Sequence, residues 1–289
     1  MLFRGPQIGL AVAASLLLGA CAYFDRDGQR EALFKAAQAD AWIATTVPAP
    51  PFNLFTMSKG AKPSAVLTVY IEGDGRAWLN RVTPSDDPTP DRPVALRLAV
   101  SDASPNVAYI ARPCQYTDVR ARDACHPRYW TSHRYAPEVI DALSTAIDSF
   151  KTRSGSSQIE LIGYSGGGAA AVLIAARRTD VARLITVAAN LDLAAWTRTL
   201  DVDPMPASLD PALEADRAAN IPQYHLAGGD DETVPPSIVR GYAARTSMPG
   251  VARIVEEVQG YSHDCCWHRD WAQRISAIRA RFGARGAGS

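Results

Sequence analysis

The chain has 289 residues, of which 47% are apolar and 21% are charged, and its 30 basic residues balance 30 acidic ones. A net charge near zero argues against a nucleic-acid partner, which normally requires a basic face. The apolar fraction argues against general disorder, and the length allows one large domain or two small ones. Five cysteines are an odd number, so in an exported protein one of them is expected to do something other than pair.

The N-terminus has the features of an export signal. A single charge, Arg4, precedes an apolar stretch from Ile8 to Leu18, which is too short for a comfortable membrane span. The sequence Leu-Gly-Ala-Cys that ends at Cys21 resembles the bacterial lipoprotein cleavage box, which implies that Cys21 becomes the new N-terminus and carries the lipid. Ala22 resembles the sorting pattern for the outer membrane. We therefore expect residues 1–20 to be removed and the mature protein to be anchored in the envelope with its body in water; an ordinary signal peptide or an uncleaved anchor is the alternative.

The other four cysteines form an even set, as expected in a compartment where disulfides persist. Three pairings are possible, and we favour Cys114 with Cys125, which closes a short loop and stabilises by roughly 3 kcal/mol on the chain-entropy model. Cys265 and Cys266 would then be a vicinal disulfide or a pair of thiols.

Metal binding is the competing interpretation of the second cysteine pair. The available donors are His263, Asp264, Cys265, Cys266 and His268. Adjacent cysteines turn poorly toward one ion, because zinc sites space paired cysteines by two to four residues. We therefore expect no metal site.

Residues 21–63 are expected to form the lipidated N-terminus and a tether, because a polar helical pattern at 31–42 is followed by the proline-rich segment 47–51. Beyond residue 64, apolar runs alternate with helical patterns. The runs are continuous, as is typical of strands buried on both faces. They are Ala65–Ile71, Val107–Ala111, Ile159–Ile162, Leu184–Ala188, Tyr224–Ala227 and Arg253–Val258.

The intervening segments predict amphipathic helices. Pro137 suits a first helical residue, and apolar residues follow it at helical spacing; a similar pattern begins at Trp271. Alternating strands and helices imply a mostly parallel sheet with helices on both faces. We expect one domain over residues 64–283 and a frayed tail over 284–289.

A glycine-rich turn after the third run contains the candidate nucleophile, Ser165. The segment Gly163-Tyr-Ser-Gly-Gly167 matches G-x-S-x-G, with a strand before it and an alanine-rich helix after it. The glycines are needed because larger side chains would collide with neighbouring backbone at so tight a turn. The helix N-terminus adds N–H groups where an oxyanion would form. A glycine-rich turn with an idle serine is the alternative.

A serine needs a base to become a good nucleophile, and that base is usually oriented by an acid. Of five histidines, His263 is the candidate base, because it lies in the loop directly after the sixth run. The others lie in a loop-rich segment before the serine, inside a buried run, or at the start of the last helix: His126, His133, His225 and His268. The fifth run ends in Gly-Gly-Asp-Asp-Glu-Thr-Val-Pro, which supplies candidate acids.

The chain order of serine, acid and histidine, each after a strand, resembles the α/β-hydrolase superfamily over roughly residues 65–282. The resemblance implies the α/β-hydrolase fold and places the acid three residues before the Val-Pro pair, at Asp231. Asp230 is the second candidate for the acid. Some members place the acid one strand earlier, which keeps Asp192 open.

The resemblance also implies an oxyanion hole built from two backbone N–H groups. Gly166 supplies the first. The second is expected at Asp74, with Gly75 next, in a Gly-Asp-Gly segment where many relatives carry His-Gly-Gly. Glu72 replaces that histidine. A plain tight turn is the alternative for this segment.

These residues together predict a serine esterase or lipase-like hydrolase without a cofactor, acting on a small-molecule ester or an acylated substrate. A non-catalytic envelope lipoprotein on the same scaffold and a peptidase of the same fold are the alternatives. Two segments, 77–103 and 115–136, are expected to cover the site, and neither the substrate nor the oligomeric state follows from the sequence. The second segment contains Arg122, Tyr129, Trp130, His133 and Arg134.

Overall fold

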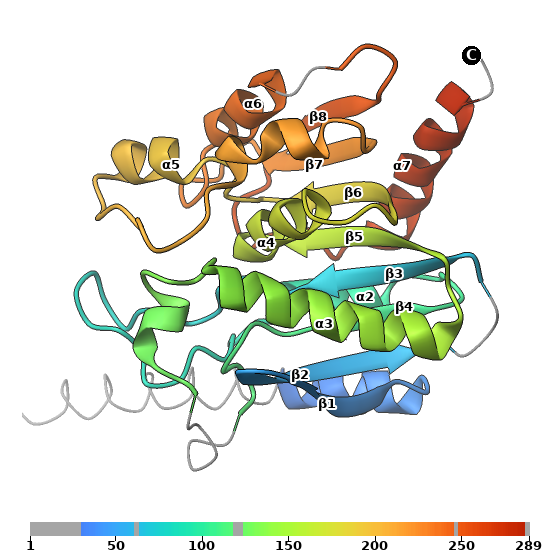
Figure 1. The fold of residues 1–289 in the computed structure, drawn as a ribbon, viewed down its shortest axis with the longest axis horizontal. Helices are drawn as coiled ribbons and strands as arrows, with labels where there is room; N and C mark the ends of the chain where they lie inside the picture. The colour runs from blue at the N-terminus through green and yellow to red at the C-terminus, as the bar shows by residue number, and fades with distance from the viewer. Residues whose placement is uncertain (1–29, 61–63, 118–123, 246–247, 287–289) are drawn as a thin grey trace, which may run out of the picture.

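The computed structural model describes residues 30–60, 64–117, 124–245 and 248–286, and within them shows an eight-stranded sheet with helices on both faces (Figure 1). The strand order is β1-β2-β4-β3-β5-β6-β7-β8. β1 and β2 are antiparallel to each other, β2 is antiparallel to β4, and all further pairs are parallel. The strands are β1 Ile43–Ala49, β2 Phe52–Lys59, β3 Val66–Ile71, β4 Val107–Ile110, β5 Gln158–Tyr164, β6 Val181–Val187, β7 Gln223–Gly228 and β8 Arg253–Val258.

The helices divide between the two faces according to the alternation of strand side chains. In β3, Leu67, Val69 and Ile71 face one apolar cluster while Tyr70 faces the other. The first cluster lies under α3, α4 and α6, and the second lies under α2, α7 and the helical residues 30–39. The bounds are α2 Val94–Val100, α3 Pro137–Ser154, α4 Gly166–Ala175, α5 Leu193–Leu200, α6 Pro236–Arg245 and α7 Trp271–Gly286, with short 3₁₀ segments at Pro127–Trp130, Pro211–Leu213 and Ala215–Ala218.

The six predicted runs correspond to β3 through β8, so the predicted α/β-hydrolase fold, a mostly parallel sheet covered on both faces, is confirmed. The fold nevertheless begins before residue 64. Residues 43–59 form β1 and β2 at one edge of the sheet, where the sequence predicts only a tether. Pro48 lies in β1, the edge strand, where a missing N–H removes no hydrogen bond from the sheet interior. At the other end, α7 continues to Gly286, into the tail that was expected to fray.

The cysteines of the folded part are paired as Cys114 with Cys125 and Cys265 with Cys266. The expected signal and lipid site, residues 1–20 and Cys21, lie outside the described residues. Within the described ranges, no helix is both long enough and apolar enough to cross a bilayer.

Candidate active site

Ser165 occupies a sharp turn between β5 and α4. Its φ of +51° lies in the left-handed region that side chains with a Cβ rarely adopt, so the surrounding backbone must hold it there. A Cβ at Gly163 would lie 2.3 Å from the Gly167 carbonyl oxygen, and one at Gly167 would lie 2.2 Å from the Ile71 carbonyl oxygen. Only glycine fits at either position. The turn therefore presents the serine at the carboxyl end of the parallel strands.

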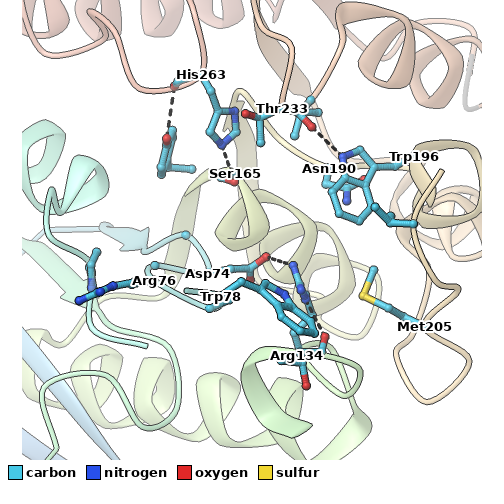
Figure 2. A pocket seen from close by; sticks show the side chains of 18 of the residues that line it. Asp74, Arg76, Trp78, Arg134, Ser165, Asn190, Trp196, Met205, Thr233 and His263 are labelled. Atoms are coloured by element: carbon cyan, nitrogen blue, oxygen red, sulfur yellow. Dashed lines mark hydrogen bonds and ion pairs between the residues drawn. The ribbon is translucent and has the colours of Figure 1, made fainter. Parts of the chain in front are cut away.

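The structure brings Ser165, His263 and Asp231 into one hydrogen-bonded chain (Figure 2 shows the serine and the histidine). His263 Nε2 lies 2.9 Å from Ser165 Oγ, and His263 Nδ1 lies 2.8 Å from Asp231 Oδ2. The Asp231 side chain is fully buried, and its other oxygen accepts the backbone N–H groups of Thr233 at 2.9 Å and Val234 at 2.7 Å. The carboxylate is thereby fixed to orient the imidazole, and the imidazole can accept the serine proton.

The two alternative acids lie elsewhere. Asp192 accepts the Ala195 N–H at 2.8 Å as the N-cap of α5 and pairs with Arg245 at 2.8 Å. Asp230 directly precedes Asp231, but among the described residues only the carboxylate of Asp231 is within hydrogen-bond distance of His263.

Tyr164, the variable residue of the motif before the serine, holds the histidine loop in place. Its hydroxyl donates to Asp264 Oδ1 at 2.9 Å and lies 3.2 Å from the His263 carbonyl oxygen. Trp267 Nε1 donates to the same carbonyl at 2.9 Å. Burial raises the pKa of the Tyr164 phenol well above its ordinary value, so it remains a neutral donor. Nothing in the sequence signals this role, because a variable motif position does not reveal which loop packs on it.

Two other histidines make contacts that are typical of structural residues. His225 is fully buried in β7 between Thr186 and Gln223, and burial, with the nearby Arg253 charge, lowers its pKa to about 3. It therefore stays neutral. His126 accepts the Arg128 N–H at the start of a 3₁₀ turn.

The two predicted oxyanion donors come from neighbouring turns. Gly166 begins α4, and Asp74 follows β3 in the loop that crosses above it; a Cβ at Gly166 would lie 2.2 Å from Asp74 Oδ1. Within the described part of the chain, the backbone N–H groups of both residues make no hydrogen bond, whereas the Gly73 N–H donates to Glu72 at 2.9 Å. Two unengaged N–H groups beside the serine are what a developing oxyanion requires. Gly75, the other predicted donor, lies next in the same loop with a φ of +66°.

The Asp74 carboxylate belongs to a largely buried cluster of ion pairs. Arg134 Nη1 lies 2.7 Å and Arg112 Nη1 lies 3.1 Å from its oxygens, and the Tyr135 hydroxyl donates at 3.1 Å. Burial raises the pKa of Asp74, but the charges of Arg134 and Arg112 outweigh it, so the pKa lies below its ordinary value. Arg134 also donates to the Thr131 carbonyl oxygen at 2.8 Å (Figure 2). These ion pairs hold the loop of Asp74 against the segment that precedes α3.

Glu72, noted in the sequence only as a replacement for histidine, supports the same loop from below. Its buried carboxylate accepts the N–H groups of Gly73, Ala95 and Leu96 and the Tyr109 hydroxyl, at 2.9 to 3.4 Å. Burial raises its pKa to about 7, against the opposing effect of these four donors. The sequence could not indicate this role, because α2 and β4 supply three of the four donors.

A cavity of about 1040 Å³ opens above Ser165. Parts of the two predicted covering segments line it, and so does residue stretch 190–205, which was not predicted. Apolar side chains from this stretch and from the loop of Asp231 contribute to the lining: Trp196, Val202, Met205 and Val234. Trp196 and Met205 lie near each other in Figure 2. Of the residues singled out in the second segment, Arg134 lines the cavity, whereas Tyr129 packs on Phe52 and Trp130 bonds to Ser85. Arg122 lies outside the described residues.

Several of the side chains considered as metal ligands contact other groups instead. Cys265 and Cys266 are paired with each other, and His263 contacts Ser165 and Asp231. Within the part of the chain that the structure describes, no group of three His, Cys, Asp or Glu side chains is placed to hold a metal ion.

No family model matches the sequence, and no curated protein matches it. Solved structures do. Est1E from Butyrivibrio proteoclasticus aligns with a TM-score of 0.59 at 12% identity, covering 84% of this chain and 99% of that one. An α/β serine hydrolase homologue from Coxiella burnetii gives 0.55 at 16% identity, over 82% and 95%. A bacterial membrane phospholipase A described as a virulence factor gives 0.57 at 16%, over 93% and 97%. The chain thus has the α/β-hydrolase fold, and these structural neighbours are hydrolases.

Proposed function

We propose that this protein is a serine hydrolase that cleaves carboxylic esters through an acyl-enzyme. The observation that carries the proposal is the continuous chain from Ser165 Oγ through the His263 imidazole to the buried Asp231 carboxylate, with links of 2.9 and 2.8 Å. An idle serine would not require a strained turn, a matched base and a buried acid together.

In the proposed reaction, Ser165 Oγ attacks the ester carbonyl carbon while His263 Nε2 accepts its proton. The N–H groups of Gly166 and Asp74 stabilise the oxyanion of the tetrahedral intermediate. His263 then returns the proton to the departing alcohol, leaving the acyl group on the serine. A water molecule, deprotonated by His263, attacks the acyl-enzyme by the same route, and the carboxylic acid and free serine result. Asp231 stabilises the imidazolium in both halves.

The apolar part of the cavity lining is our reason for proposing an ester rather than a peptide. The apolar lining from Trp196, Val202 and Met205 can bury an acyl group beside the serine, as ligand pockets usually do. The neighbouring structures include an esterase, a phospholipase and a puromycin-hydrolysing peptidase, so the fold alone does not distinguish these activities.

The test is replacement of the nucleophile. Ser165→Ala is expected to lower kcat on p-nitrophenyl butyrate by about a thousandfold or more, because serine and histidine act as a unit. The wild type is expected to react covalently with a fluorophosphonate probe at Ser165, whereas the variant is not. Ser237→Ala, an exposed serine on α6, is the matched control and should retain both properties. Equal activity of Ser165→Ala and wild type would refute the proposal, and an unlabelled, inactive wild type would favour the non-catalytic alternative.

We also propose that the protein is exported and held in the bacterial envelope, in the outer membrane and facing the periplasm, by lipid on Cys21. The cleavage-box sequence before Cys21 supports this, as does the even set of cysteines that remains after it. The described residues add no helix able to span the membrane, and the proposed anchor does not require one.

A further inference from the structure

Three arginines line the active-site cavity without a carboxylate partner. Arg76, Arg81 and Arg92 all belong to the loop between β3 and α2, and their side chains are exposed. Within the described residues, none of the three forms an ion pair or a side-chain hydrogen bond. Arg134 also lines the cavity, but it forms an ion pair with Asp74.

The carboxylates of the cavity are mostly engaged elsewhere. Asp74 binds two arginines from below, Asp264 accepts the Tyr164 hydroxyl, and Glu72 receives four donors under the loop. Asp91 has a contact of its own, and Asp203 belongs to stretch 190–205 rather than to the loop that carries the arginines. The exposed side chains of Arg76, Arg81 and Arg92 therefore remain available to an anionic ligand.

Arg76 and the apolar side chains Trp196 and Met205 lie in different parts of the cavity. In Figure 2, Arg76 lies on one side of Asp74, while Trp196 and Met205 lie on the other, and Ser165 stands between the two groups. A substrate that spans the serine would present one end to an apolar surface and the other to guanidinium groups.

We propose that the substrate is an ester whose acyl group is apolar and whose alcohol part bears an anionic group, a carboxylate or a phosphate. This inference rests on the proposed hydrolase function. Guanidinium forks match the oxygens of carboxylates and phosphates, and like charges lining a concave surface raise the local concentration of anions. The acyl group packs on Trp196 and Met205, and the anion contacts Arg76, Arg81 and Arg92.

The test compares esters that differ only in charge. Butyrate esters of 3-hydroxybenzoate and 3-hydroxybenzamide have the same acyl group and similar leaving groups, one anionic and one neutral. Dihexanoylglycerol phosphate and dihexanoylglycerol form the second pair, in which the anion is a lipid phosphate. We expect kcat/KM to be about tenfold higher for the anionic member of at least one pair. The preference should shrink as ionic strength rises, because the arginines are exposed.

Arg76→Gln combined with Arg92→Gln should bring the anionic-to-neutral ratio close to one. Arg198→Gln, an exposed arginine on α5 that does not line the cavity, is the matched control and should keep the wild-type ratio. Fluorophosphonate labelling of Ser165 verifies that each variant retains its site.

The outcomes separate the two proposals. A preference for the carboxylate pair, the phosphate pair or both, lost in the double variant, supports the inference and identifies the anion. Hydrolysis of the neutral and anionic esters at equal rates overturns the inference and leaves the hydrolase function standing. A preference that survives in the double variant also overturns it, because the charge would then be recognised elsewhere. Failure to hydrolyse any ester or to label would overturn the proposed function itself.

Discussion

Glu72 links the stability of the protein to the loop of Asp74, the proposed second oxyanion donor. The carboxylate is buried between β3, β4 and the start of α2, and its oxygens accept the Gly73 N–H and two N–H groups of α2. Four donors favour the ionised form, but burial disfavours it more strongly and raises the pKa to about 7. Near neutral pH, this group therefore exists in both protonation states.

The sign of the resulting pH dependence follows from the direction of that shift. Between pH 4.5 and 7, folded Glu72 holds a proton that the unfolded chain has released, so its contribution to the unfolding free energy is complete below about 4.5 and is lost as the pH rises through about 7. Glu72→Gln removes this titration. Relative to the variant, the wild type should lose a few kcal/mol of unfolding free energy between pH 4.5 and 8. Urea unfolding of both proteins across that range measures it, and parallel stability curves would contradict the assignment.

The residues of the predicted triad follow from local patterns, whereas the residues that hold them do not. Ser165 lies in a glycine motif, and His263 directly follows a strand, so both could be found from the sequence, with Asp231 added by the family resemblance. Tyr164 and Glu72 act through segments distant in the chain: Tyr164 contacts a loop 99 and 100 residues away, and Glu72 bonds to residues 23 to 37 positions away. No local pattern records such contacts.

At the level of elements, the parallel strands were predictable because burial on both faces makes each one a continuous apolar run. β1 and β2 were not, because β1 is an edge strand with alternating exposure and prolines near its end. Such a segment has the composition of a linker. Its place in the sheet depends on pairing with β2 in an antiparallel register, from Ile43 opposite Ser58 to Ala49 opposite Phe52.

The segment from α5 through the following loop contributes apolar side chains to the cavity lining. Trp196 lines the cavity and its Nε1 donates to the Thr233 carbonyl oxygen at 2.8 Å, which joins α5 to the loop of Asp231. We expect Trp196→Ala to lower the ratio of kcat/KM for p-nitrophenyl hexanoate over acetate by about tenfold, because only the longer chain reaches the lost surface. Trp196→Phe retains most of that surface and should keep a ratio nearer the wild type.

Steady-state kinetics on the two esters measure this effect. Equal losses on acetate and hexanoate would place the contribution of Trp196 in the Thr233 contact rather than in acyl binding, because that contact supports the acid loop for every substrate.

At the level of the whole molecule, the early start of the fold shortens the connection to the proposed anchor. Helical residues 30–39 pack Ala37 into the second apolar cluster, so the folded body includes residues well before residue 64. Arg30 lies nine positions after Cys21, and a chain of that length spans at most about 30 Å. Lipid on Cys21 would therefore hold the folded domain close to the membrane surface, where acylated substrates of the proposed hydrolase would lie within reach.

This arrangement predicts that attachment and catalysis are separable. Cys21→Ser, expressed with its own signal, should move the protein from the membrane fraction to the soluble periplasmic fraction. Its specific activity on a water-soluble ester should stay within about twofold, because among the described residues none that lines the site precedes residue 72. Activity on the same acyl group presented in vesicles should fall further, since the variant no longer resides at the surface. Fractionation and kinetics on both substrate forms test this together. A Cys21→Ser protein that still sediments with membranes would show that something other than the lipid holds it there.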